Sequence, residues 1–276
     1  MKRLWLICLV LLALCISGCA SKETPSKEVQ ETKVAYEVID EGGRRHIFNE
    51  KPKRIVSLSY GTDEILTELV EANRIAAYCR WAEDSGITFI TQEQFKKVGR
   101  KTDGNAEEVL ALKPDLVLAT TAMSSDIINA LDALGLKVYL ASRPKNYEQM
   151  RQKVLKLGEV VGEKAKGEAL VKEMDERMVK LEAKLSQIPD DERKTVVAFN
   201  FLSAMGRKGD LIDSMMNKAH IINGVAQIPT ELATGYISKE QVVRVNPDIF
   251  FLATWDYDNK HNVDEYVAQI KNDPAY

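Results

Sequence analysis

Between residues 54 and 142, short apolar segments alternate with segments whose apolar residues recur every three or four positions. The short segments are rich in β-branched residues, and the others have the period of an amphipathic helix. The strands that this pattern predicts are IVSLS from Ile55, IAAYC from Ile75, LVLAT from Leu116 and KVYLAS from Lys137. Strands that alternate with helices favour a parallel sheet with helices on its faces. We therefore predict an α/β N-terminal lobe over residues 45–144.

Residues 146–188 contain no strand pattern and no proline. Their apolar residues form two stripes at helical spacing, and Gly158 and Gly162 predict a break between the stripes. A helix over residues 163–188 would be about 39 Å long at the usual rise per residue. This length suits a strut between two domains, so we predict a linking backbone helix over residues 145–190. A coiled-coil arm is the alternative.

The alternation of strands and helices resumes after Pro189. TVVAFNF from Thr195 and DIFFLAT from Asp248 predict strands, and the segments between and after them have helical periods. We therefore expect a C-terminal lobe of the same architecture over residues 191–276. The last predicted helix ends close to Tyr276, where the pattern of the first lobe would continue with another strand. We expect this second lobe to be C-terminally truncated.

One helix-and-strand phrase occurs in both halves of the chain. EEVLALKPDLVLA begins at Glu107, and EQVVRVNPDIFFLA begins at Glu240. Each copy contains a Pro-Asp pair at the same offset, and apolar residues keep their places between the matching positions. A match of this kind indicates two copies of one structural unit, so we expect the two lobes to be similar.

The helical period predicts which side chains of each copy face the core. These are Val109, Leu110 and Leu112 in the first copy and Val242, Val243 and Val245 in the second. Glu107 and Glu240 would then be exposed in the first turn of their helices. A carboxylate at that end interacts favourably with the helix dipole, so helix capping is one interpretation of the paired glutamates.

The N-terminus has the organisation of a bacterial lipoprotein signal peptide. Two basic residues precede the apolar segment Leu4–Ile16, which is shorter than the about 20 residues that a membrane span needs. The sequence ISGC that follows resembles a lipobox, in which Cys19 would be diacylated after removal of the signal peptide, residues 1–18. Residues 19–35 are polar and lack an apolar period, so we predict a lipid anchor and a flexible tether. A secretory signal with an unmodified cysteine is the alternative.

Composition and motifs give no support to several classes of function. The formal net charge of −3 lacks the basic excess that is typical of nucleic-acid-binding proteins. After export and lipidation only Cys79 would remain as a free thiol, so no intramolecular disulfide is expected. The chain contains no GxSxG, HExxH or GxxxxGK[ST] motif and no GxGxxG that opens a helix. His46, His220 and His261 are too scattered to suggest a zinc site. Catalysis, a resident metal and an intrinsic cofactor are all unsupported.

The order of lipobox, tether, lobe, long helix and second lobe resembles the helical-backbone class of ABC-transporter substrate-binding proteins, which serves ferric siderophores, cobalamin and haem. The segments that carry the resemblance are PKRIVSLSYGTDEILTELV, GNAEEVLALKPDLVLA and ISKEQVVRVNPDIFFLA. The resemblance implies two Rossmann-like α/β lobes, each a mainly parallel sheet with flanking helices, joined by a long backbone helix. It also implies an exported, lipid-anchored monomer that faces the periplasm or the extracellular surface and works with a permease dimer and its ATPase subunits.

Ligands of open α/β sheets bind beyond the carboxyl ends of the strands. The candidate ligand-binding residues therefore follow the predicted strands: Tyr60, Arg80, Trp81, Thr120, Arg143, Phe201, Trp255 and Tyr257. Aromatic side chains offer flat apolar contact, and arginines pair with carboxylate or catecholate oxygens. This set favours a bulky, partly anionic metal chelate in a cleft between the lobes. A ferric siderophore ranks first, a cobalamin or related corrinoid second and haem third, whereas three scattered histidines argue against capture of bare Mn²⁺ or Zn²⁺.

In the family that the sequence resembles, glutamates at the positions of Glu107 and Glu240 form salt bridges with arginines of the two permease subunits. The resemblance therefore implies that each lobe presents one carboxylate to a symmetric partner. Two other classes stay open. A surface adhesin would share the lipobox and the tether but would lack paired lobes with a cleft, and a lipid-anchored hydrolase would place a nucleophile and a base at a strand end.

Overall fold

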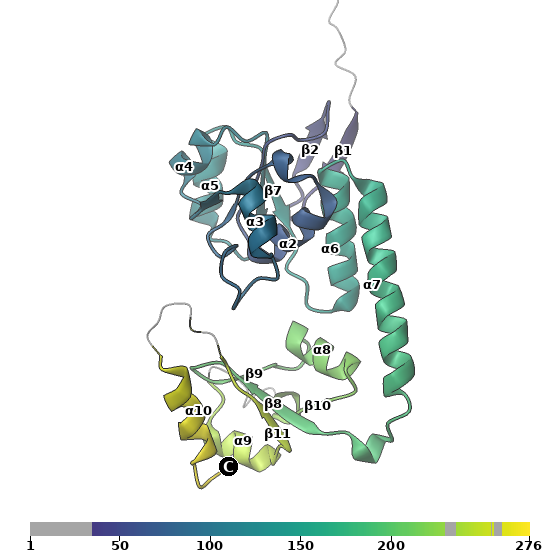
Figure 1. The fold of residues 1–276 in the computed structure, drawn as a ribbon, viewed down its shortest axis with the longest axis vertical. Coiled ribbons are helices and arrows are strands. Elements are labelled where there is room, and N and C mark those ends of the chain that lie inside the picture. Colours follow the sequence, from purple (N-terminus) through teal and green to yellow (C-terminus); the bar gives the residue numbers. More distant parts are fainter. Residues whose placement is uncertain (1–34, 230–235, 255, 257–260) are drawn as a thin grey trace, which may run out of the picture. The chain divides into compact units, whose positions relative to one another are not determined.

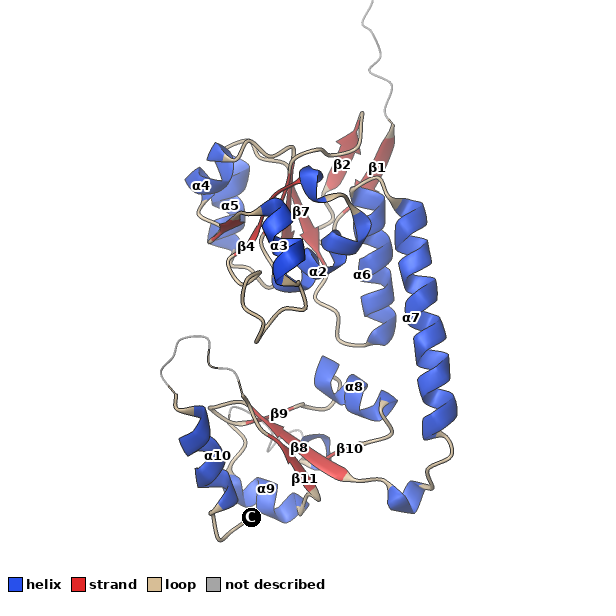
Figure 2. Ribbon diagram, viewed as in Figure 1, coloured by secondary structure: helices blue, strands red, loops and turns tan. Residues whose placement is uncertain are grey.

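The computed structural model describes residues 35–229, 236–254, 256 and 261–276 (Figure 1). The predicted signal peptide, Cys19 and most of the predicted tether lie outside the described residues, as do Trp255 and Tyr257. Helices and strands alternate along the described chain, and the strands form mainly parallel sheets (Figure 2). The predicted α/β fold class is thereby confirmed. No helix within these described ranges is long and apolar enough to cross a membrane.

The N-terminal half is built on a parallel sheet of five strands. These strands are β3 (Ile55–Ser57), β4 (Ile75–Cys79), β5 (Lys101–Thr102), β6 (Leu116–Thr120) and β7 (Val138–Ala141). The helices between them are α2 (Tyr60–Leu69), α3 (Gln92–Val98), α4 (Ala106–Ala111) and α5 (Ser125–Ala133). The strand order is β5-β4-β3-β6-β7, and every neighbouring pair is parallel. The carboxyl ends of the strands therefore lie at one edge of the sheet.

Alternate residues of the central strands contribute to separate cores on the two faces of this sheet. Ile55 and Leu116 belong to one core, which residues of α2, α3 and α6 (Tyr147–Val160) complete. Val56 and Val117 belong to the other core, which residues of α4 and α5 complete. All residues of β3 and β6 are buried, as expected for parallel strands with helices on both faces.

Two helices occupy residues 145–190, the region of the predicted backbone helix. α6 and α7 (Lys164–Leu185) run side by side (Figure 1). The chain breaks between them at Gly162, whose φ is +75°. Gly158 instead lies inside α6, where an added Cβ would come within 3.1 Å of Gly167 Cα in α7. The prediction of a break is correct at Gly162 and wrong at Gly158, because the glycine at 158 allows the two helices to approach closely.

The C-terminal half has a smaller sheet of four strands. Its elements are β8 (Thr195–Phe199), β9 (Ala204–Met205), α8 (Leu211–Lys218), β10 (Ile222–Asn223), α9 (Lys239–Val245), β11 (Ile249–Phe251) and α10 (Val263–Lys271). β10 and β11 pair in parallel with β8, and β9 pairs antiparallel with β8. Val197 packs in a core with Val242 of α9, whereas Val196 packs in a core with Met216 of α8. A helix therefore packs on each face of β8, as in the first half.

The repeated phrase builds the same unit in both halves. α4 and α9 are each followed by a residue with a left-handed backbone, Lys113 with φ 49° and Asn246 with φ 50°. A Pro-Asp pair comes next in each copy, and β6 and β11 then pair in parallel with the central strands β3 and β8. The prediction that the phrase marks two copies of one structural unit is confirmed.

One detail of that prediction is wrong. Val109 and Val242 are buried as expected, at 0% and 1% exposure, but Leu110 and Val243 are each 41% exposed. Adjacent residues of an α-helix point about 100° apart, since there are 3.6 residues in a turn. Helices of six and seven residues bury a single line of side chains against their sheets, so the residue after each buried valine faces outward.

A β-hairpin precedes the first sheet, and the sequence pattern did not predict it. It consists of β1 (Tyr36–Ile39) and β2 (Arg45–Phe48), which pair antiparallel. Asp40 holds the hairpin to the sheet, because its Oδ2 accepts a hydrogen bond from the Leu140 N–H at 3.1 Å while its Oδ1 accepts from the Gly42 N–H within the turn. The hairpin thus joins the core of the N-terminal half directly after the predicted tether.

Candidate functional site

Four of the predicted ligand-binding residues lie at the carboxyl edge of the five-stranded sheet. Tyr60 is the first residue of α2, Arg80 and Trp81 directly follow β4, and Arg143 follows β7. Tyr60 is 45% exposed, the two arginines are exposed, and Trp81 is half-buried. Because β3, β4 and β7 are parallel members of one sheet, these residues lie along the same edge.

Arg80 and Trp81 form a stacked pair. The Arg80 Cζ atom lies 4.6 Å from the centroid of the Trp81 ring, which is the geometry of a cation–π contact. A planar guanidinium over an indole presents positive charge and hydrogen-bond donors beside an apolar face. The pair therefore suits a flat ligand that carries oxygen anions.

A buried carboxylate fixes the strand end directly before this pair. Asp63, in the first turn of α2, is fully buried, and its Oδ2 accepts a hydrogen bond from the Cys79 N–H at 3.0 Å. Burial raises the pKa of Asp63 to about 7. Within the described chain its Oδ1 has no hydrogen-bond partner. Asp63 is not among the residues predicted from the sequence, although an acidic residue three positions before Leu66, on the apolar side of a predicted helix, was an available signal.

The segment between β4 and α3 is held by a second acidic residue of α2. Glu64 Oε1 accepts hydrogen bonds from Thr88 Oγ1 at 3.2 Å and from the Phe89 N–H at 2.9 Å. The Phe89 side chain is 91% exposed. An aromatic ring held in solvent by an anchored backbone offers apolar contact area to a ligand or a partner. Phe89 is not among the residues predicted from the sequence, because it does not directly follow a predicted strand.

Thr120 does not have the exposure that a ligand contact needs. It is the last residue of β6 and is only 8% exposed, whereas the next residue, Thr121, is exposed. At the end of β6, Thr121 rather than Thr120 is therefore exposed enough to contact a ligand.

In the C-terminal half, Phe201 lies two residues after β8 within an aromatic cluster. Its ring stacks on the His261 ring, with centroids 4.7 Å apart, and meets the Tyr266 ring edge-to-face at 5.0 Å. Tyr266 donates its hydroxyl hydrogen bond to the Asn200 carbonyl at 3.0 Å, which anchors α10 beside the end of β8. His261 was treated as an isolated histidine in the sequence analysis, because nothing in the sequence pattern indicates its proximity to Phe201.

Glu107 and Glu240 occupy the same position in two helices. Each is the second residue of its helix, after an N-cap residue whose side chain accepts backbone hydrogen bonds, Asn105 in α4 and Ser238 in α9. Both glutamates are exposed. Hydrogen bonds from its own backbone N–H and from the Ser238 side chain hold the pKa of Glu240 below its usual value. Glu240 is therefore ionised at neutral pH, as helix capping and salt-bridge formation both require.

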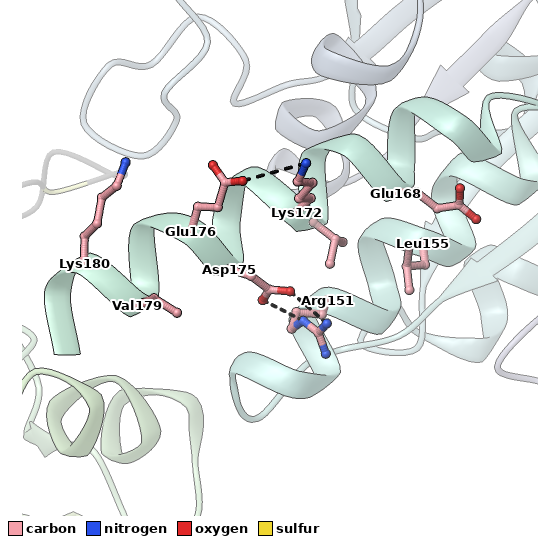
Figure 3. Close-up of a pocket in the computed structure, with 9 residues that line it drawn as sticks. Arg151, Leu155, Glu168, Lys172, Asp175, Glu176, Val179 and Lys180 are labelled. Atoms are coloured by element: carbon pink, nitrogen blue, oxygen red, sulfur yellow. Dashed lines mark hydrogen bonds and ion pairs between the residues drawn. The ribbon is translucent and has the colours of Figure 1, made fainter. Parts of the chain in front are cut away.

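A groove between α6 and α7 lies outside the predicted site (Figure 3). Leu155 and Val179 supply part of its apolar lining. Four of the charged residues around it form ion pairs with one another: Arg151 Nε lies 2.8 Å from Asp175 Oδ1, and Lys172 pairs with Glu176 (Figure 3). Pairing of this kind is typical of a solvated helix surface. Lys180 also lines the groove and has no ion pair among the described residues, so one positive charge of the groove lining is left uncompensated.

Comparison with known proteins places these features in a family. The family model described as "Periplasmic binding protein" matches residues 55–276. The ABC transporter substrate-binding lipoprotein YvrC of Bacillus subtilis is 28% identical over 257 residues, which cover 87% of this chain and 77% of that protein. The B. subtilis protein YfiY, named a probable siderophore-binding lipoprotein, is 24% identical, with coverage of 92% and 79%.

A similar fold is found among solved structures. The crystal structure of a possible iron-binding, periplasmic solute-binding protein from Staphylococcus epidermidis superposes with a TM-score of 0.63. The match covers 82% of this chain and 84% of that protein at 20% sequence identity. At this identity the likeness establishes the fold alone.

Proposed function

Because the chain belongs to the periplasmic binding protein family, we propose that it captures an iron(III)–siderophore complex and delivers it to an ABC importer. It is a substrate-binding protein of the importer class that serves siderophores, cobalamin and haem, and it is a transport component rather than an enzyme. Its partners are a permease and the ATPase subunits that drive it.

The stacked pair Arg80–Trp81 at the carboxyl edge of the parallel sheet is the observation that carries the proposal. A ferric siderophore presents flat catecholate groups or carboxylate and hydroxamate oxygens, and the pair offers an apolar face and a cation together. Asp63 fixes the backbone directly before the pair, which reduces the ordering cost of binding. Tyr60 and Arg143 at the same edge would extend this contact surface.

The C-terminal half would supply the second wall of the site. Phe201 and His261 form a stacked aromatic surface at the end of β8, the central strand of the smaller sheet. Trp255 and Tyr257 follow β11 in the sequence and remain proposed contacts. A cargo that touches both halves would meet aromatic rings from each, as a large chelate requires.

Ligand binding by the full chain in detergent tests the proposal. We expect intrinsic tryptophan fluorescence to change on addition of a ferric siderophore, with micromolar or tighter affinity, equivalent to about 8 kcal/mol or more. Arg80→Ala and Trp81→Ala should each weaken binding. Arg177→Ala is the matched control, because Arg177 is an exposed arginine of α7 that pairs with Glu173. Binding of cobalamin or haem in place of every ferric siderophore would refute the proposed cargo, and an absence of binding to all three would refute capture of a large chelate.

The docking residues are Glu107 and Glu240. Their support is geometric: the two glutamates are exposed, hold the same position in equivalent helices and belong to the two halves of the chain. A permease made of two similar subunits would meet one carboxylate on each half. We therefore propose that each glutamate pairs with a basic residue of one permease subunit.

Membrane attachment would come from lipidation at Cys19. Relatives named as lipoproteins support an exported, membrane-anchored protein. Two acyl chains anchor a protein stably without a membrane-spanning helix. Labelled fatty acid should be incorporated into the wild-type chain and absent from Cys19→Ala. Retention of the label in that variant would refute the assignment of Cys19.

A further inference from the structure

Lys153 of α6 lies beside the first turn of α2. Its side chain is buried, with 6% exposure. Apart from the chain neighbours of Gly61 and the backbone of its own helix, the Lys153 Nζ atom is the one heavy atom of the described residues within 4 Å of an ideal Cβ built on Gly61, at 3.9 Å. Gly61 is the second residue of α2, directly after Tyr60. The ammonium group is therefore directed at the N-terminus of a ten-residue helix.

This is an unfavourable place for an unpaired cation. The N-terminal end of a helix carries a partial positive charge, and burial of an ammonium group is costly without a negative partner. Within the part of the chain that the structure describes, Lys153 makes no hydrogen bond and no ion pair. Burial lowers its pKa, and the carboxylates of Glu64 and Asp63 oppose that shift at longer range. Those two carboxylates already accept hydrogen bonds from the Phe89 and Cys79 amides.

The backbone of α2 adds donors at the same place. The Thr62 and Asp63 N–H groups both donate to the Ser59 carbonyl at 2.9 Å, and the Ser59 side chain caps no backbone amide. The Tyr60 and Gly61 N–H groups have no acceptor among the described residues. Two backbone donors without an acceptor in the described chain and one ammonium group thus lie at the same helix end. Helix N-terminal anion sites use donors of this kind.

We propose that Lys153 and the Tyr60 and Gly61 amides form a subsite for a carboxylate at the periphery of the cargo. The inference rests on the proposed function, since the subsite lies after β3, at the sheet edge that carries Arg80 and Trp81. A carboxylate subsite at this edge narrows the proposed cargo to ferric chelates that keep a free carboxylate. Gly61 leaves the approach to the donors open, because it has no side chain.

Two variants separate the subsite from the fold. Lys153→Met keeps the apolar stem and removes the charge. Gly61→Ala adds a methyl group beside the backbone donors, 3.9 Å from the Lys153 ammonium. Alanine is a better helix former than glycine, so this variant is expected to keep or raise the melting temperature. Lys156→Met is the matched control, because Lys156 is an exposed lysine of the same helix that pairs with Glu159.

The probes are ferric citrate, ferrichrome, metal-free citrate and inorganic phosphate. Ferric citrate has carboxylates, whereas ferrichrome is a neutral hydroxamate chelate. We expect Lys153→Met and Gly61→Ala to weaken ferric citrate binding about tenfold or more, with ferrichrome binding unchanged and the control like wild type. Metal-free citrate should shift the Tyr60 and Gly61 amide resonances of the wild-type full chain and should not shift them in either variant.

The contrary results distinguish failure of the subsite, failure of its assignment to a carboxylate and failure of the proposed iron cargo. Unshifted Gly61 and Tyr60 amides in citrate would overturn the subsite, as would unchanged ferric citrate affinity in a folded Gly61→Ala chain. Amides that respond to phosphate but not to citrate would overturn its assignment to a carboxylate. If citrate shifts these amides but neither iron chelate binds the wild-type chain, the subsite stands and the proposed iron cargo fails.

Discussion

Asp115 and Asp248 perform the same task in the two halves of the chain. Asp115 Oδ1 accepts a hydrogen bond from the Arg54 N–H at 3.0 Å, and its other oxygen accepts from the Lys53 N–H at 2.6 Å, directly before β3. Asp248 Oδ2 accepts from the Thr195 N–H at 2.7 Å at the start of β8. Each aspartate thus connects the strand that follows it, β6 or β11, to the central strand of its sheet, β3 or β8. This shared role explains why the Pro-Asp pair occurs twice.

The first prediction concerns the stability of these strand ends. Asp115→Ala and Asp248→Ala should each lower the free energy of unfolding by about 1 kcal/mol, because each removes charge-assisted hydrogen bonds that are partly exposed to solvent. Urea denaturation followed by circular dichroism measures the change. Asp103→Ala serves as control, since Asp103 is exposed and makes no interaction in the described chain. Equal effects in all three variants would show that the three hydrogen bonds of Asp115 and Asp248 contribute nothing specific.

The second prediction is a dependence of stability on pH that comes from Asp63. Its pKa is about 7 in the folded chain, because of burial, and near 4 when unfolded. Between these values the native state holds a proton that the unfolded state has released, so the free energy of unfolding should fall as the pH rises from about 4 to about 7. Asp63→Asn should remove this contribution and raise the melting temperature at pH 8.

The matched control for this prediction is Glu68→Gln on the same helix. Glu68 is exposed, so its substitution should leave the pH profile unchanged. In the Asp63→Asn variant the amide carbonyl oxygen of the new side chain can still accept the hydrogen bond of the Cys79 N–H, which keeps the geometry of the strand end. If Asp63→Asn and wild type have parallel profiles of melting temperature between pH 4 and pH 8, the burial of an ionisable carboxyl at this position has no energetic consequence.

The third prediction addresses the contact between α6 and α7. Gly158→Ala would place a methyl carbon 3.1 Å from Gly167 Cα and 3.2 Å from the Glu163 carbonyl oxygen, both backbone atoms that cannot move independently. We expect a loss of about 1–3 kcal/mol, although alanine is the better helix former, because the helices must separate. Thermal unfolding measures it. Gln152→Ala, at an exposed position of α6, should be neutral or slightly stabilising, and a similar result for Gly158→Ala would contradict close helix packing.

The main elements of the fold were predictable because their apolar periods are long or repeated. α2, α5 and α7 have stripes of apolar residues at helical spacing. The strands β4, β6 and β7 of the first sheet are continuous runs of mainly apolar residues. The β1–β2 hairpin was missed because Asp40, which fixes it, acts through hydrogen bonds to distant backbone such as Leu140. The role of Gly158 was misjudged for the same kind of reason: its constraint is a neighbouring helix, which one sequence segment does not reveal.

The sequence predicts which sheet edge carries the candidate residues, but it does not predict which of them are exposed. The rule that ligands bind beyond strand ends selects Tyr60, Arg80 and Trp81 from the positions of the strands alone. Exposure depends on packing, so the same rule selects the buried Thr120. Phe89 is exposed because Glu64 on another element anchors its backbone. Lys153 is notable only because it is buried without a partner in the described chain, which a periodic helical sequence does not disclose.

The fourth prediction separates capping from docking at Glu107 and Glu240. Either role places a carboxylate in the first helical turn, but only docking requires one on each half of the molecule. Glu107→Gln and Glu240→Gln should leave cargo affinity and melting temperature nearly unchanged, because both side chains are exposed and their helices keep the N-cap hydrogen bonds of Asn105 and Ser238.

Transport is where the two roles differ. Loss of one partner of an interfacial charge pair is costly, so each single variant should reduce cargo-stimulated ATPase activity, and the double variant should reduce uptake about tenfold or more. Glu108→Gln is the control, since Glu108 is the next residue of α4, is also exposed and lies in the same helical turn. Normal uptake by the double variant would leave capping as the role of both glutamates. Loss of cargo binding would instead place them in the ligand site, because a docking contact acts after the cargo has been captured.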